Sequence, residues 1–192
     1  MEPRDRFKIV VVCTGNRFRS PLAEHVLRRA ADGLPVDVRS VGVLDLGAVG
    51  ALPEALEAAR ELGLDLSDHR TCVLTPEPLD GADLVLGFER AHIARAVVNG
   101  GAPLDRTFTL PELVELLESL PPVRADDPVT RARTVVSAVA SSRPDPRRGP
   151  VPELVDPLGK SATFFRRTAE QVNELSERLI ERLFGSRSEG PT

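Results

Sequence analysis

Residues 8–21 read Lys-Ile-Val-Val-Val-Cys-Thr-Gly-Asn-Arg-Phe-Arg-Ser-Pro, and they give the strongest indication of the fold. Its first part, residues 8–12, is a β-branched run without polar alternation, which is typical of a strand buried on both faces of a parallel sheet. From Ser20 onward the apolar residues recur at helical spacing, Pro21 suits the first helical position, and Gly33 predicts the stop. The stretch therefore predicts a strand, a tight loop and a helix in succession.

The same alternation of strand and helix continues along the chain. We expect further strands at residues 36–40, 83–88 and 106–109. We expect further helices at residues 53–62, 89–98, 111–120, about 129–141, and 164–183. This order predicts an α/β fold of three layers, in which helices flank a central four-stranded parallel sheet and ligands bind at the carboxyl ends of the strands.

Length and composition predict one globular domain over residues 1–192. Hydrophobic residues at 41% and charged residues at 28% are near the globular average, which argues against a disordered or fibrous chain. The formal net charge of -4 argues against nucleic acid as a partner, because binding a phosphate backbone requires a basic face. The sequence contains neither an apolar run of membrane-helix length nor a signal peptide, so we expect a cytoplasmic protein with no membrane partner.

The segment 121–152 differs from the rest of the chain, because it holds seven prolines and six arginines. We interpret it as an insertion that contains the short helix at about 129–141. Its arginines form either a solvated face or a lid over the substrate, and in the second case they would steer acidic substrates toward the site. From about residue 185 the polar tail is expected to fray.

The loop that follows the first strand has the composition of an anion-binding site. A loop that leaves a parallel strand and enters a helix presents several backbone N–H groups to one point, and the helix dipole adds positive potential there. Gly15 lets the backbone approach a ligand closely, and Asn16 is a residue type that tolerates positive φ. Arg19 can direct two donors at two phosphate oxygens.

Cys13 lies at the floor of the same positive field, which predicts a reactive thiolate and therefore a nucleophile. Ser20 either donates its hydroxyl to that thiolate or caps the helix. The second cysteine, Cys72, is expected to be a packing residue. Two cysteines make no disulfide framework, and no Cys/His cluster has the spacing of a zinc site.

The loop resembles the phosphate loop of the low-molecular-weight protein tyrosine phosphatase family, Cys-x-Gly-Asn-x-x-Arg-Ser-Pro near the N-terminus. The similarity extends to Ser40 in Ser-Val-Gly, to residues 63–70 around His69, to the strand at 83–86, and to Asp156 in Asp-Pro. The segment 121–152 lies outside it.

This resemblance implies a phosphomonoester hydrolase, of the protein-tyrosine-phosphatase type, that forms a phosphocysteine intermediate. Cys13 would attack phosphorus, Arg19 would hold the phosphoryl oxygens, and Asp156 would protonate the leaving oxygen and later activate water. Asp126 and Asp127 are the next candidates for the acid. The implied substrate-binding residues are Thr14, Gly15, Asn16, Arg17, Phe18 and Ser20, and the implied loop supports are Ser40 and His69. The substrate would be a phosphotyrosine protein or a small phosphomonoester, the product inorganic phosphate, and no metal or cofactor is required.

Three positions depart from the family pattern. Phe18 stands where many members have a second cysteine, so we expect no protective disulfide in the loop. Leu158 and Gly159 follow the Asp-Pro pair where members selective for phosphotyrosine have aromatic residues, and the chain contains no Tyr or Trp. Arg17 stands where members acting on phosphoarginine have a small hydroxyl residue, and its cation would disfavour a guanidinium leaving group.

Two other functions use the same kind of loop. An arsenate reductase would pass its oxidised sulfur to a resolving thiol, and because only Cys72 is available besides Cys13, that route requires an external thiol. A non-catalytic phosphate-binding regulatory module would keep the loop but would not need Asp156.

Overall fold

The computed structural model describes residues 6–145 and 149–185. Within these ranges four parallel strands form one sheet in the order β2-β1-β3-β4. They are β1 (Phe7–Cys13), β2 (Val36–Gly42), β3 (Leu84–Gly87) and β4 (Thr107–Thr109). β1 lies between β2 and β3, so it is a central strand of the sheet. Its last residue, Cys13, is therefore at the carboxyl end of a central strand and not of an edge strand. The predicted α/β fold with a central four-stranded parallel sheet is confirmed.

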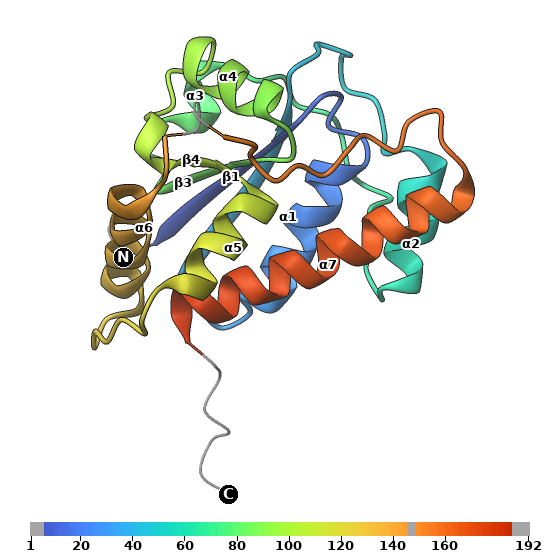
Figure 1. Ribbon diagram of the computed structural model, residues 1–192. Coiled ribbons are helices and arrows are strands. Elements are labelled where there is room, and N and C mark those ends of the chain that lie inside the picture. Colours follow the sequence, from blue (N-terminus) through green and yellow to red (C-terminus); the bar gives the residue numbers. More distant parts are fainter. Residues whose placement is uncertain (1–5, 146–148, 186–192) are drawn as a thin grey trace, which may run out of the picture.

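Helices cover both faces of this sheet (Figure 1). On one side of the sheet, α1 (Arg19–Ala30) and α5 (Leu110–Ser119) contact the strands, and α2 (Pro53–Glu61) and α7 (Ala162–Phe184) pack against these helices. The other face packs against α3 (Pro76–Leu79) and α4 (Arg90–Val98). A 3-10 turn at Leu104–Arg106 leads into β4. The four-residue α3 was not predicted, because so short a helix produces no apolar periodicity.

The sheet divides the apolar core into two clusters. Alternate side chains of β1 enter them, with Ile9 and Val11 in the larger cluster and Val10 and Val12 in the smaller one. All four are fully buried, which is the double burial that the β-branched run predicted. Among the described residues, no helix has both the length and the apolar character needed to cross a membrane.

The predicted helix of the segment 121–152 is α6 (Pro128–Ser142), and it belongs to the core. Its buried residues are Val129, Ala132, Val135, Val136 and Val139. Just beyond its last turn, Arg143 forms a 2.6 Å ion pair with Glu112 of α5 and lies over the ring of Phe108, 4.3 Å from the centroid. Both charged side chains are less than a tenth exposed. Arg143 is therefore a structural cation.

The other arginines described on α6 also turn away from the carboxyl edge of the sheet. Arg133 pairs with Asp83 at 2.8 Å, and Asp83 directly precedes β3, so this ion pair lies at the opposite edge. Arg131 donates to the carbonyl oxygen of Val123. The interpretation of these arginines as a lid over the substrate is wrong. The arginines at 147 and 148 lie outside the described residues, as does the tail beyond 185.

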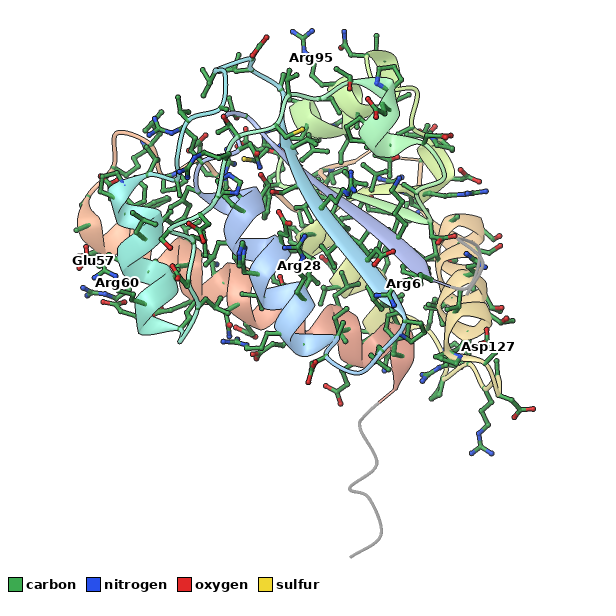
Figure 2. The ribbon with its side chains drawn as sticks, turned by 180° about the vertical axis from the view of Figure 1, so that it is seen from behind. Arg6, Arg28, Glu57, Arg60, Arg95 and Asp127 are labelled. Atoms are coloured by element: carbon green, nitrogen blue, oxygen red, sulfur yellow. The ribbon has the colours of Figure 1, made fainter. Side chains whose placement is uncertain are left out.

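Figure 2, which views the molecule from behind, shows where the N-terminus of α6 lies relative to the start of β1. Asp127, the N-cap residue of α6, lies on the same side of the molecule as Arg6, which directly precedes β1. The side chain of Asp127 accepts a hydrogen bond from the backbone N–H of Thr130 at 2.6 Å. Asp127 is therefore a helix cap at the amino edge of the sheet, which excludes it as the alternative acid.

Candidate active site

The loop from Cys13 to Phe18 curls because two residues allow it. Asn16 has φ of 50°, inside the left-handed region that this residue type tolerates, and its backbone N–H points at Cys13 Sγ at 3.2 Å. Gly42 of β2 lies so close to the loop that a Cβ there would meet the backbone nitrogen of Asn16 at 2.9 Å. The fold therefore requires glycine at position 42 for the loop to close around the sulfur.

Cys13 is almost completely buried, and its sulfur lies 3.0 Å from Ser20 Oγ. Ser20 Oγ accepts a hydrogen bond from Asn16 Nδ2 at 2.9 Å, and its own proton has two acceptors within reach, the sulfur at 3.0 Å and the carbonyl of Val41 at 3.4 Å, of which the sulfur is nearer. The helix α1 already begins at Arg19, and its N-cap is Phe18. Of the two roles considered for Ser20, the contact with Cys13 is the one observed.

The side chain of Asn16 connects the loop to its surroundings. It is fully buried, donates from Nδ2 to Ser40 Oγ at 2.8 Å, and accepts from the backbone N–H of Cys72 at 2.9 Å. Ser40 donates in turn to the carboxylate of Glu24 at 2.5 Å. The contact between Ser40 and the loop was implied by the resemblance, whereas Glu24 was not identified from the sequence.

His69 supports the loop from the other side. Its Nε2 lies 2.7 Å from the carbonyl oxygen of Asn16. Because a carbonyl only accepts, Nε2 carries the proton and donates it. Burial lowers the pKa of His69 below its ordinary value, more strongly than the hydrogen bond to Asn16 raises it. This histidine is therefore a neutral structural donor.

Arg19 is buried and holds two carboxylates. Its Nη2 donates to Asp156 at 2.5 Å, and its Nη1 donates to the carboxylate of Glu89 and to the carbonyl of Leu154 at 2.9 Å. Glu89 is the N-cap residue of α4, and Asp156 comes from the segment that precedes α7. The structure thereby brings Asp156 to the phosphate loop, with 38% of its side chain exposed.

His92 also reaches this site, although the sequence assigned it no role. It lies in the first turn of α4, is 3% exposed, and its Nε2 is 3.1 Å from Thr14 Oγ1. Burial, followed by the positive charge of Arg19, lowers the pKa of His92 to about 4. No sequence pattern indicates this contact, because the two residues are 78 positions apart.

Two side chains of the loop, those of Phe18 and Arg17, make contacts with other parts of the chain that the sequence did not indicate. The ring of Phe18 is 4% exposed and packs edge-on against Phe165, with 5.0 Å between centroids. The side chain of Phe18 therefore belongs to the core. Arg17 is half-buried, because its Nε donates to the carbonyl of Gly50 at 3.0 Å.

Cys72 is exposed, so the expectation of a packing role for it is wrong. Its backbone N–H is nevertheless the group that fixes the amide of Asn16. Within residues 6–145 and 149–185, no group of three His, Cys, Asp or Glu side chains has the geometry of a metal site.

Comparison with known proteins places this geometry among phosphatases. The sequence model of the family described as "Low molecular weight phosphotyrosine protein phosphatase" matches residues 8–139. The chain is 30% identical to the protein-arginine-phosphatase of Bacillus subtilis over 177 residues, which cover 91% of this chain and 95% of that protein. It is 35% identical to the low molecular weight protein-tyrosine-phosphatase Etp of Escherichia coli over 116 residues, which cover 60% of this chain and 77% of Etp.

Among solved structures, the chain is similar to a YwlE arginine phosphatase in which serine replaces cysteine and the active-site serine is phosphorylated. The two share 29% identity with a TM-score of 0.69, and the match covers 94% of this chain and 98% of the other.

Proposed function

The chain belongs to the low molecular weight phosphotyrosine protein phosphatase family, and we propose that Cys13, Arg19 and Asp156 carry out its phosphatase reaction. It is a cysteine-dependent phosphatase by family. The observation that carries the assignment of residues is the contact between Arg19 Nη2 and Asp156 Oδ2, which joins the loop after β1 to an acid from the far end of the chain.

In the first step the sulfur of Cys13 forms a bond to phosphorus while the bond from phosphorus to the leaving oxygen breaks. Arg19 and the loop N–H groups stabilise the charge on the remaining oxygens. The leaving oxygen takes its electron pair from the broken bond and a proton from Asp156. Ser20 and the N–H of Asn16 stabilise the thiolate before the attack, because both donate toward the sulfur.

In the second step water attacks the phosphocysteine. Asp156, now a carboxylate, takes the proton of that water, and the bond between phosphorus and sulfur breaks. The electron pair returns to Cys13 as a thiolate, and inorganic phosphate leaves. Glu89 orients the guanidinium of Arg19 throughout, since its carboxylate stays bound to Nη1.

The substrates are phosphorylated proteins, and phosphotyrosine is the first candidate for the residue that is attacked. Phosphoarginine is a second candidate, because two relatives that this chain matches along 95% and 96% of their length are named protein-arginine-phosphatases. We expected the cation of Arg17 to disfavour a guanidinium leaving group. That expectation is weakened, because the Nε of Arg17 donates to the carbonyl of Gly50. Several apolar side chains are exposed beside the site, and those of Leu44, Leu46, Val155 and Leu158 are all aliphatic.

A direct test uses p-nitrophenyl phosphate with the purified chain. We expect turnover that EDTA leaves unchanged and vanadate inhibits, and no turnover in a Cys13→Ala variant. Loss of activity in EDTA, or turnover by the variant, contradicts the assignment. A pair of peptides that differ only in phosphotyrosine or phosphoarginine then ranks the two substrates by kcat/KM. Arsenate with an added thiol tests for arsenate reduction, which the phosphatase assignment predicts to be absent.

A further inference from the structure

Thr14 directly follows Cys13 in the loop, and its hydroxyl faces two donors. Thr14 Oγ1 lies 3.1 Å from Nε2 of His92 and 3.4 Å from Nη2 of Arg19. His92 lies on α4, and Arg19 opens α1, so the two donors come from opposite faces of the sheet. The residue beside the nucleophile is thus held from both sides.

The hydrogen bonds of His92 determine which ring nitrogen carries the proton. Nδ1 accepts from the backbone N–H of Phe88 at 3.2 Å and of Glu89 at 3.1 Å, so Nδ1 is unprotonated. The pKa of His92, lowered to about 4 by burial and by Arg19, keeps the ring neutral near pH 7. The single proton is therefore on Nε2, and His92 donates it to Thr14 Oγ1.

The hydroxyl proton of Thr14 is consequently free for another acceptor. Its oxygen receives hydrogen bonds from His92 and Arg19, which occupy both lone pairs. The donor on Arg19 is the same Nη2 that binds Asp156 at 2.5 Å. The hydroxyl therefore lies on the side of the loop where the guanidinium and the acid meet, and a phosphoryl group bound by Arg19 presents charged oxygens there.

We propose that Thr14 Oγ1 donates a hydrogen bond to a phosphoryl oxygen during the reaction, and that His92 is the positioning residue that holds Thr14 in this donor orientation. The proposal rests on the proposed function of the Cys13 loop. A donor oriented before the reaction needs no reorganisation as charge shifts onto the phosphoryl oxygens, so its effect is largest in the transition state.

A purely structural role for His92 predicts a different behaviour. If His92 only caps the first turn of α4, replacing it changes stability and disturbs the site independently of Thr14. If it acts through Thr14, its effect on catalysis disappears once the hydroxyl is gone. A double-mutant cycle distinguishes the two roles, because only the second gives a coupling energy in kcat/KM.

The experiment measures p-nitrophenyl phosphate turnover and vanadate inhibition for the wild type, Thr14→Val, Thr14→Ser, His92→Phe and the Thr14→Val/His92→Phe double variant. We expect Thr14→Val to lower kcat/KM by about 10- to 100-fold, the range for a hydrogen bond to a charged group, and to weaken vanadate binding similarly. Thr14→Ser, which keeps the hydroxyl, should recover most of the loss. Thr134→Val, an exposed and remote change of the same kind, is the control.

Each outcome supports or contradicts a different role of Thr14, His92 or the loop. A wild type without turnover contradicts the proposed function itself. An active wild type whose Thr14→Val variant stays within twofold overturns the role of the hydroxyl. Additive losses in the cycle overturn the positioning role of His92. If His92→Phe does not fold, the comparison of Thr14→Val with Thr14→Ser still decides whether the hydroxyl acts on the phosphoryl group.

Discussion

Oδ2 of Asp156 lies 2.5 Å from Nη2 of Arg19, and the two residues are 137 positions apart in the sequence. Asp156, the proposed proton donor to the leaving oxygen, is thus held by Arg19, the proposed ligand of the phosphoryl oxygens. The guanidinium of Arg19 fixes the position of the Asp156 carboxylate relative to the phosphate-binding loop. The two residues have different proposed roles, so replacing each one should change catalysis in a different way.

Asp156→Asn should slow phenyl phosphate much more than p-nitrophenyl phosphate. Protonation matters in proportion to the basicity of the leaving oxygen, and it contributes typically about 10²- to 10⁴-fold. The measurement is kcat for a series of aryl phosphates against the pKa of the leaving phenol. Asp127→Asn is the matched control, because Asn also caps helices and Asp127 lies at the α6 N-terminus. Equal losses across the series would place the acid elsewhere.

Phe18→Ala should destabilise the protein by about 3 to 5 kcal/mol, the usual cost of removing a buried ring. The ring contacts Phe165 of α7, so the cavity would open between the loop and that helix. Denaturant unfolding measures the change in the free energy of unfolding. Val98→Ala, at a side chain 80% exposed, is the control and should change stability little. A Phe18→Ala variant as stable as the control would show that this ring is not a core residue.

Arg133→Gln should leave the preference between acidic and basic phosphopeptides unchanged. Arg133 pairs with Asp83 at the amino edge of the sheet, and exposed charges are screened over about 8 to 10 Å at moderate ionic strength. The measurement is the ratio of kcat/KM for the two peptides at low and at high salt. If the ratio of kcat/KM between the acidic and the basic peptide were closer to one in the variant than in the wild type, Arg133 would steer acidic substrates after all.

The free energy of unfolding should fall as the pH decreases from about 6.5 to about 4, in part because of His92. The folded protein keeps this ring neutral with a pKa of about 4, whereas in the unfolded chain it titrates near its ordinary value of 6.5. Unfolding therefore takes up a proton in this window, and each such proton contributes up to about 1.4 kcal/mol per pH unit.

His92→Gln should reduce that slope, while the lowered pKa of His69 leaves a remainder of the same sign. Urea unfolding of both proteins at several pH values is the measurement. Parallel pH profiles would mean that His92 is protonated in the folded state, in conflict with its hydrogen bonds to Phe88 and Glu89.

The sequence predicted the elements whose signal is local. The β-branched run before Cys13 indicated a doubly buried strand, and Asn16 indicated the left-handed turn that it adopts, with φ of 50°. The expected strands and longer helices agree with the structure to within about two residues, because burial in this fold follows the period of each element. Asp156 was found through family resemblance, since nothing local distinguishes it from a turn residue.

What the sequence missed depends on contacts between distant segments. Glu24, Glu89 and His92 reach the site only because α1 and α4 pack on opposite faces of one sheet. The direction of a loop side chain is likewise set by tertiary packing, so the sequence did not show that the ring of Phe18 points into the core. For the arginines of the segment 121–152 the sequence left both a solvated face and a lid open, because their number did not reveal partners such as Glu112.

We assign to Cys13 the role of carrying the phosphoryl group between the two steps, and acid-quench labelling shows whether it does. The wild type is mixed with ³²P-labelled substrate, quenched in acid within one turnover, digested and analysed by mass spectrometry. We expect one labelled peptide, modified at the sulfur of Cys13, and no label in Cys13→Ala. Turnover by the wild type without any labelled peptide, or with the label on another residue, would contradict it.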